Sequence, residues 1–130
     1  MFRRRPPDGS WSALEYTAYV ADVLDHLGPA IRRVTLEDNP SITFFDKDVR
    51  AADQAYNRLD RAEVLGWLDI ACAELASVLE AVNADDWTRP GRLPEGDQDV
   101  LTMARNGVHA GAHHLRDVQR VLAAVRGRPA

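Results

Sequence analysis

The stretch Val108-His109-Ala110-Gly111-Ala112-His113-His114-Leu115-Arg116-Asp117-Val118 holds three of the four histidines and lies inside the most regular apolar repeat of the chain. Around it, apolar or small residues recur at alternating spacings of three and four: Leu101, Ala104, Val108, Gly111, Leu115, Val118, Leu122 and Val125. This spacing is typical of an amphipathic helix with one buried stripe. We therefore expect a long helix over about residues 98–126.

Two further long helices are expected, over about residues 12–37 and 61–83. Ser12 with Glu15 has the spacing of a capping box, and Asp60 with Glu63 repeats the signal. The first helix has a stripe of the same spacing at Tyr16, Val20, Val23, Leu27, Ile31 and Val34. The second has it at Leu65, Leu68, Cys72, Leu75, Leu79 and Val82, so Cys72 is predicted to be a buried core residue and not a nucleophile.

The rest of the chain is less regular. A short helix is expected near residues 48–57, and Ile42-Thr43-Phe44-Phe45 reads as a loop laid over the end of a bundle. Residues 85–96 form a connection rich in proline and glycine, anchored by Trp87, and no strands are expected. The predicted fold is an all-α antiparallel helical bundle, a single domain over residues 11–127. Residues 1–10, with Arg3-Arg4-Arg5, are expected to be a flexible basic tail.

Composition excludes several classes of protein. The 130 residues are 45% hydrophobic, which suits one compact domain. The 16 basic and 20 acidic residues give a net charge of -4, which argues against a nucleic-acid partner. Neither a membrane-length apolar run nor a secretory signal is present. One cysteine excludes an internal disulfide, so a cytoplasmic location is expected.

Scattered motifs resemble those of the DinB superfamily. They are Trp11-Ser12-Ala13-Leu14-Glu15-Tyr16, Val20-x-Asp22-Val23, Phe45-Asp46-Lys47-Asp48, Asp86-Trp87 and His113-His114-Leu115-Arg116-Asp117-Val118. The resemblance implies a four-helix bundle, often dimeric, that holds a divalent cation such as zinc or nickel with three side chains. These are a histidine on one helix and two residues four apart on the last. Relatives of this family include transferases and isomerases that use mycothiol or bacillithiol, and many members without an assigned activity.

Carried over by position, the family's metal ligands fall on Tyr19, Ala110 and His114. A neutral phenol is a poor ligand, because its pKa of about 10 resists deprotonation. Alanine has no donor at all. The resemblance therefore implies a metal site that retains one ligand of three.

A second register keeps more donors. His109 and His113 are four residues apart, a spacing by which one helix supplies two ligands, and Asp117 continues the row as a carboxylate that could orient an imidazole. This row lies about 140 to 180° from the centre of the apolar stripe, whereas His114 lies about 80° away. We therefore expect His114 at the bundle edge and the row nearer solvent, unless a partner covers it.

A partner is expected because DinB relatives have a long helix before the Trp-Ser segment. This chain has only about ten residues there, so either a second copy fills the groove or the natural chain starts further upstream. We expect an isologous homodimer.

Three functional hypotheses follow. In the first, the protein is a degenerate, non-catalytic member in which Tyr19 fills the metal position and donates a hydrogen bond to His114 or a neighbouring carboxylate. In the second, the same pocket binds a small ligand. In the third, a cation bound by histidines activates a thiol or water, as in a metal-dependent S-transferase or isomerase, with Asp22, His26 or Asp117 moving protons. His26 taken alone reads as a flank residue paired with Asp22, four residues earlier.

Overall fold

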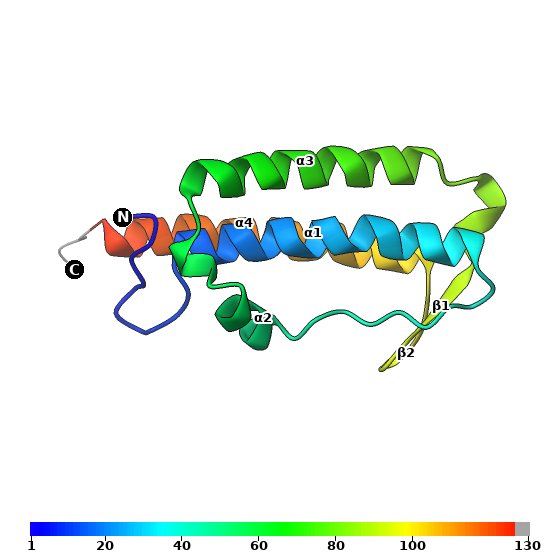
Figure 1. The fold of residues 1–130 in the computed structure, drawn as a ribbon, viewed down its shortest axis with the longest axis horizontal. Helices are drawn as coiled ribbons and strands as arrows, with labels where there is room; N and C mark the ends of the chain where they lie inside the picture. Colours follow the sequence, from blue (N-terminus) through cyan, green and yellow to red (C-terminus); the bar gives the residue numbers. More distant parts are fainter. Residues whose placement is uncertain (127–130) are drawn as a thin grey trace.

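The computed structural model describes residues 1–126 and is mostly helical, as expected (Figure 1). Its elements are α1 (Ala13–Leu36), α2 (Lys47–Asp53), η1 (Tyr56–Arg58), α3 (Arg61–Glu80), η2 (Ala84–Asp86), β1 (Pro90–Leu93), β2 (Gly96–Asp99) and α4 (Val100–Val125). The first and last residues of the three long helices lie within three residues of the expected positions. Residue 127, the expected end of the domain, lies outside the described part. None of the helices in residues 1–126 is long and apolar enough to cross a membrane.

Helix α1 is the central element. It begins with the expected capping box, in which the Ser12 hydroxyl accepts from the Glu15 amide and the Glu15 carboxylate accepts from the Ser12 amide. Most of its side chains are buried, on nearly every side of the helix, because α3, α4 and the segment 37–60 all lie against it. A helix surrounded in this way fixes the position of every other element.

The long helices do not all alternate in direction. Gly28 of α1 lies beside Leu75 and Val78 of α3, and the start of α1 packs near the start of α3, so these two helices run parallel. Helix α4 is antiparallel to α1, because Ala13 clusters with Val121 whereas Leu27 approaches Gly107. The expected antiparallel arrangement relative to α1 therefore holds for α4 and not for α3. Helix α3 is parallel to α1 because residues 37–60 return along the length of α1 before α3 begins (Figure 1).

Two short regions differ from expectation. The prediction of no strands was wrong, because β1 and β2 form an antiparallel hairpin in which Pro90 pairs with Asp99. This hairpin closes through Gly96 at a φ of +134°, and its pairing comes from backbone hydrogen bonds that apolar patterning does not signal. The expected helix near 48–57 is divided into α2 and η1, because Ala55 between them adopts a left-handed φ of +48°.

The buried faces of α3 and α4 are rotated from the predicted stripes. Both helices pack on α1 and have few contacts with each other. Leu65 and Cys72 on α3 and Val108 and Leu115 on α4 are exposed, so the prediction of Cys72 as a core residue was wrong. The inner faces use Val64, Ala71 and Val78 on α3 and Val100, Met103, Gly107 and Val121 on α4, together with Leu75, Ala104 and Val125 of the predicted stripes. The exposed members of the predicted stripes lie on flanks where no described element covers them.

Residues 1–10 lie against the bundle, which differs from the expected flexible tail. The Phe2 carbonyl accepts a hydrogen bond from the Leu14 amide at 2.9 Å, and the Phe2 ring packs beside the core. Arg5 donates two hydrogen bonds to the Glu15 carboxylate, at 2.8 and 2.7 Å. Glu15 is only 3% exposed, so its charge requires such a partner, and the basic segment supplies it.

Candidate functional site

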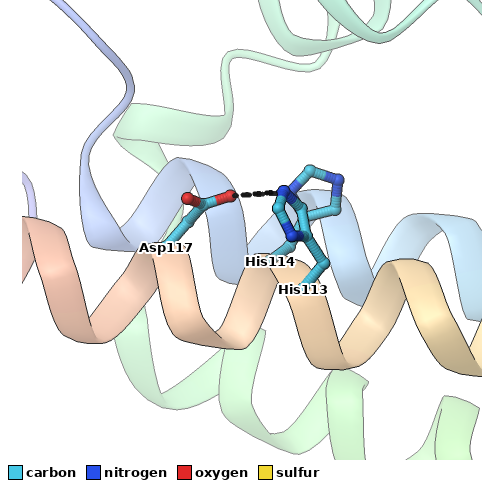
Figure 2. Close-up of side chains that lie close together, drawn as sticks. All are labelled: His113, His114 and Asp117. Carbon is cyan, nitrogen blue, oxygen red and sulfur yellow. Dashed lines mark hydrogen bonds and ion pairs between the residues drawn. The ribbon is translucent and has the colours of Figure 1, made fainter.

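His114 lies on the face of α4 that is turned toward α1. Its ring stacks on Tyr16, with centroids 5.7 Å apart, and stands edge-on to Tyr19 at 5.2 Å. Its Nδ1 atom is 3.1 Å from a carboxylate oxygen of Asp117, one turn further along the helix (Figure 2). The inward rotation of α4 therefore places His114 in the interface, closer to α1 than the apolar stripe indicated.

The other two histidines of α4 lie further out. His113 is 63% exposed, and its Nε2 atom is 3.8 Å from the Asp117 carboxylate. His109 is exposed, and its ring stacks on that of His113 with centroids 6.5 Å apart. The row of His109, His113 and Asp117 thus borders solvent, as helical geometry predicted.

One group near these residues could hold a metal ion. Ligand atoms of His113, His114 and Asp117 all lie within 4.8 Å of one another (Figure 2). Imidazole and carboxylate donors suit a divalent transition metal. All three donors come from one turn of one helix, however, and the Asp117 carboxylate already lies 3.5 Å from Arg120. The α1 residues that face His114 are Tyr16 and Tyr19, whose neutral phenols are weak metal ligands. The donor set fits a metal in type, and α1 adds no strong ligand to it.

Tyr19 remains a neutral phenol at physiological pH. Burial raises its pKa above the ordinary value of about 10, and the negative charges of Asp46 and Asp48 raise it further. A phenolate ligand would require the opposite shift. This side chain therefore packs as a neutral aromatic group against Trp11, Phe45 and His114.

A small pocket opens beside Tyr19, between α1, α4 and the segment before α2. Its volume is about 180 Å³. Its walls are mostly apolar, with two amide side chains, and are formed by Tyr19, Val23, Leu27, Phe44, Gln98, Met103, Asn106, Gly107 and Ala110. Tyr19 and Ala110, which the family resemblance marks as ligand positions, both line the pocket. The close approach of α4 depends on Gly107, because a Cβ there would lie 2.1 Å from Leu27 Cδ2.

A buried charge network lies beside this pocket, on the adjoining face of α1. Asp22 is fully buried and accepts hydrogen bonds from Arg50 and from the Tyr56 hydroxyl. His26 Nδ1 is 2.7 Å from the Asp22 carbonyl oxygen and 3.2 Å from its carboxylate. Burial, and then the hydrogen bond to Asp22, raise the pKa of Tyr56 strongly, so it remains a donor. Asp22 therefore faces α2 and η1, and His26 lies against Phe45; neither contacts His114.

Phe45 connects this network to the pocket. Its ring lies 5.1 Å from the Arg50 guanidinium and 5.1 Å from the His26 ring, and stands edge-on to Tyr19 at 6.2 Å. The adjacent residue, Phe44, lines the pocket. The network on α1 thus fixes the segment that closes one side of the pocket.

Several site residues were not predicted from the sequence. Arg50, Tyr56, Phe44 and Met103 come from segments far apart in the chain, and no spacing pattern joins them to Tyr19. The signal that could have identified one of them is the Phe44-Phe45 pair directly before Asp46, which caps α2 through the amides of Asp48 and Val49. Two adjacent aromatic side chains beside a helix cap favour packing of this segment against the helical bundle.

Comparisons with known proteins agree with this architecture. The chain is similar to YfiT from Bacillus subtilis, which is described as a probable metal-dependent hydrolase with an unusual four-helix bundle topology. The identity is 15% and the TM-score 0.75, over 94% of this chain and 73% of that one, so the likeness shows a shared fold alone. None of the curated proteins compared matches the chain. The family model of the DinB superfamily matches residues 2–118. The chain therefore belongs to the DinB superfamily.

Proposed function

We propose that this protein is a non-catalytic DinB member that binds a small uncharged ligand in the pocket between α1, α4 and Phe44. One observation carries the proposal. Two of the three positions where the family resemblance expects metal ligands hold Tyr19 and Ala110, and both line this pocket. Apolar and neutral groups thus occupy the space that a metal centre would need.

The lining of the pocket defines the class of ligand. No acidic, basic or imidazole side chain lines it, and Gln98, Asn106 and Tyr19 are its polar members. Burying an ionised group without a partner is costly, so a charged ligand would be disfavoured. A volume of about 180 Å³ compares with the cavity of about 150 Å³ that accommodates benzene in another protein. A neutral single-ring molecule with one hydrogen-bonding group fits this description.

The surroundings of His114 support a structural role for it. Its Nδ1 atom faces Asp117, and its ring lies between Tyr16 and Tyr19. Aromatic contacts of this kind contribute about 0.5–1.5 kcal/mol each beyond simple burial. In this proposal His114 holds α4 against α1, and its aromatic contact with Tyr19 sets the wall of the pocket.

Ligand-observed NMR with phenol, benzyl alcohol and benzoate tests the proposal. We expect phenol and benzyl alcohol to bind and benzoate to bind roughly tenfold more weakly or not at all. Ala110→Leu fills the pocket and should abolish binding. Ala112→Leu, at an exposed position on the same helix, is the matched control and should leave it unchanged. Equal binding by the two variants, or no binding by the natural sequence, would reject the pocket.

The second candidate function is metal-dependent chemistry at His113, His114 and Asp117. The donor atoms of this group support it, as does the description of YfiT as a probable metal-dependent hydrolase. A bound zinc or nickel ion would lower the pKa of a thiol or water, which suits a thiol transferase, an isomerase or a hydrolase. Asp117 would orient His114 through its carboxylate. Asp22 and His26 contact Arg50, Tyr56 and Phe45 and not this group, so they would take no part.

Elemental analysis of tag-free protein distinguishes the two candidates. Zinc or nickel at one ion per chain, lost in His114→Ala but kept in His26→Ala, would favour the metal-dependent candidate. Metal-free protein whose melting temperature does not change on adding zinc or nickel would favour the small-ligand proposal.

A further inference from the structure

A second cavity lies between α1 and α3, and its chemistry differs from that of the pocket beside Tyr19. Its volume is about 330 Å³, and none of its lining residues belongs to the other pocket. Leu24 on α1 and Leu75 and Val78 on α3 are its buried apolar members. Its other walls carry ionised side chains, which the pocket beside Tyr19 does not. We call it the α1–α3 cavity.

Three charged residues line the α1–α3 cavity. Asp25 and Arg32 come from α1 and Glu74 comes from α3. Asp25 is half-buried, whereas Arg32 and Glu74 are exposed. None of the ion pairs within residues 1–126 includes any of the three. The cavity therefore offers charges of both signs to a ligand, and no partner within the described chain has to be displaced.

The two carboxylates lie toward one end of the cavity and the guanidinium toward the other. A Cβ on Gly28 would lie 3.9 Å from the Leu75 Cα, so these two residues mark the same level of the parallel helices. At about 1.5 Å per residue, Asp25 and Glu74 both lie before this level, within about 3 Å of each other along the axis. Arg32 lies about 6 Å beyond it. The acidic and basic ends are thus about 9 Å apart at the Cα atoms, and the long Arg32 side chain, which leans toward the start of α1, shortens this span.

The acidic end has the acceptors that an ammonium group needs. Pro29 lies inside α1 and has no N–H group, so the Asp25 carbonyl, four residues earlier, lacks its usual helical donor. Helix carbonyls point toward the C-terminus, and Pro29 itself lines the cavity. With the carboxylates of Asp25 and Glu74, this oxygen makes three acceptors for the three donors of an ammonium group. A metal ion is less suited, because the group of three metal-binding side chains found within residues 1–126 lies on α4.

We propose that the α1–α3 cavity binds a small zwitterion whose ammonium and carboxylate ends are about 7 Å apart, the length of an extended dipeptide. The ammonium group lies between Asp25 and Glu74. The carboxylate pairs with Arg32 through the two parallel hydrogen bonds that a guanidinium favours. Ser77, between the two ends, offers its hydroxyl to the peptide group. A single amino acid spans only about half this length and reaches one end at a time.

Ligand-observed NMR titration of the natural sequence is the first test. We expect glycylglycine to bind with a dissociation constant of about 1 mM or lower. N-acetylglycylglycine lacks the ammonium charge and glycylglycinamide lacks the carboxylate, so both should bind roughly tenfold more weakly, as should glycine. The zwitterion 5-aminopentanoate has a similar length and no peptide group. Tighter binding of glycylglycine would identify a peptide as the ligand, and tighter binding of 5-aminopentanoate an ω-amino acid. Binding of neither zwitterion, or equal binding of the two capped peptides, would overturn the proposal.

The second test uses isosteric variants of the charged residues. Glu74→Gln should weaken glycylglycine binding by roughly fivefold. Glu80→Gln is the matched control, because Glu80 is exposed on the same helix and does not line the cavity. Arg32→Gln should weaken binding of glycylglycine and leave that of glycylglycinamide unchanged, since the amide has no carboxylate to lose. Equal effects of Glu74→Gln and Glu80→Gln, or equal losses for both peptides in Arg32→Gln, would reject the assigned roles.

A third measurement separates this site from the pocket beside Tyr19. Ala110→Leu fills that pocket and should abolish phenol binding while glycylglycine binds as before. Glu74→Gln should have the opposite pattern. Loss of glycylglycine binding in a folded Ala110→Leu protein would place the zwitterion in the other pocket and overturn this proposal. Failure of phenol to bind the natural sequence would count against the small uncharged ligand alone.

Discussion

Asp22 on α1 and Arg50 on α2, 28 residues apart in the sequence, form a bidentate ion pair. The carboxylate oxygens accept hydrogen bonds from the Nε and Nη2 atoms of Arg50, at 2.7 and 3.1 Å. The Tyr56 hydroxyl donates to the same carboxylate at 2.5 Å. Because the Arg50 guanidinium also covers the Phe45 ring, this pair holds the segment that supplies Phe44 to the pocket. The stability of the fold and the shape of the pocket therefore depend on one buried carboxylate.

Replacing this carboxylate should destabilise the protein. Asp22→Asn leaves the Arg50 charge without a partner, which for a buried pair costs about 3–5 kcal/mol. We expect the lower end of that range, because Arg50 is 30% exposed and water can solvate part of it. The free energy of unfolding in urea, followed by circular dichroism, measures the loss. Asp53→Asn, at an exposed position of the same helix as Arg50, should change it little.

Adding one methyl group at Gly107 should disturb the contact between α4 and α1. The new Cβ would lie 2.1 Å from Leu27 Cδ2, so the buried Leu27 side chain must move. Overpacking of this kind costs about 1–3 kcal/mol. Gly66→Ala is the matched control, because nothing lies within 4 Å of the equivalent atom on α3. That variant should be stabilised by about 0.5–1 kcal/mol, since alanine is the better helix former. Equal effects of the two substitutions would contradict the close approach at Gly107.

The positions of the helices could be predicted from the sequence, and their buried faces only in part. Caps at Ser12, Asp60 and Asp99 are local signals, and each begins a helix in the structure. The face that a helix buries depends on its neighbours. Leu115 and Cys72 belong to regular apolar stripes, yet both are exposed, because α3 and α4 contact α1 alone along most of their length.

The candidate site could be predicted where one helix or a family motif was sufficient. His114 and Asp117 are three residues apart on one helix, and Tyr19 followed from the register of the Trp-Ser motif. Their arrangement beside Phe44, Phe45 and Arg50 depends on how residues 37–60 fold back along α1. No periodicity encodes that path.

The ion pair between Arg5 and Glu15 predicts a change of stability in acid. Burial alone would raise the pKa of Glu15, but the hydrogen bonds from Arg5 and from the Ser12 amide outweigh it and lower the pKa. A carboxyl group with a lowered pKa in the folded state stabilises the protein above its unfolded pKa of about 4.3. This contribution is lost as the pH falls through the folded pKa.

Arg5→Ala should therefore make unfolding less dependent on pH in this acidic range. Urea unfolding at a series of pH values from neutral into the acidic range measures the slope. Arg3→Ala is the control, because Arg3 donates to the Leu59 carbonyl and not to a carboxylate. Identical slopes for the two variants would show that Arg5 does not set the pKa of Glu15.

Restoring two histidines should create a metal site in the pocket. Tyr19→His with Ala110→His places imidazoles at the two positions that lack a ligand, beside His114. Three histidines are a common zinc-binding set, and we expect about one zinc ion per chain by elemental analysis. Bound metal stabilises the folded state, so the melting temperature should rise with zinc concentration.

Tyr19→His with Ala112→His is the matched control, because Ala112 is exposed on α4 whereas Ala110 lines the pocket. The control has the same number of histidines and should gain little zinc. Equal zinc in both proteins would mean that surface histidines such as His109 and His113 bind the ion. In that case Tyr19 and Ala110 would not mark a lost metal site, and the pocket would have to be explained without it.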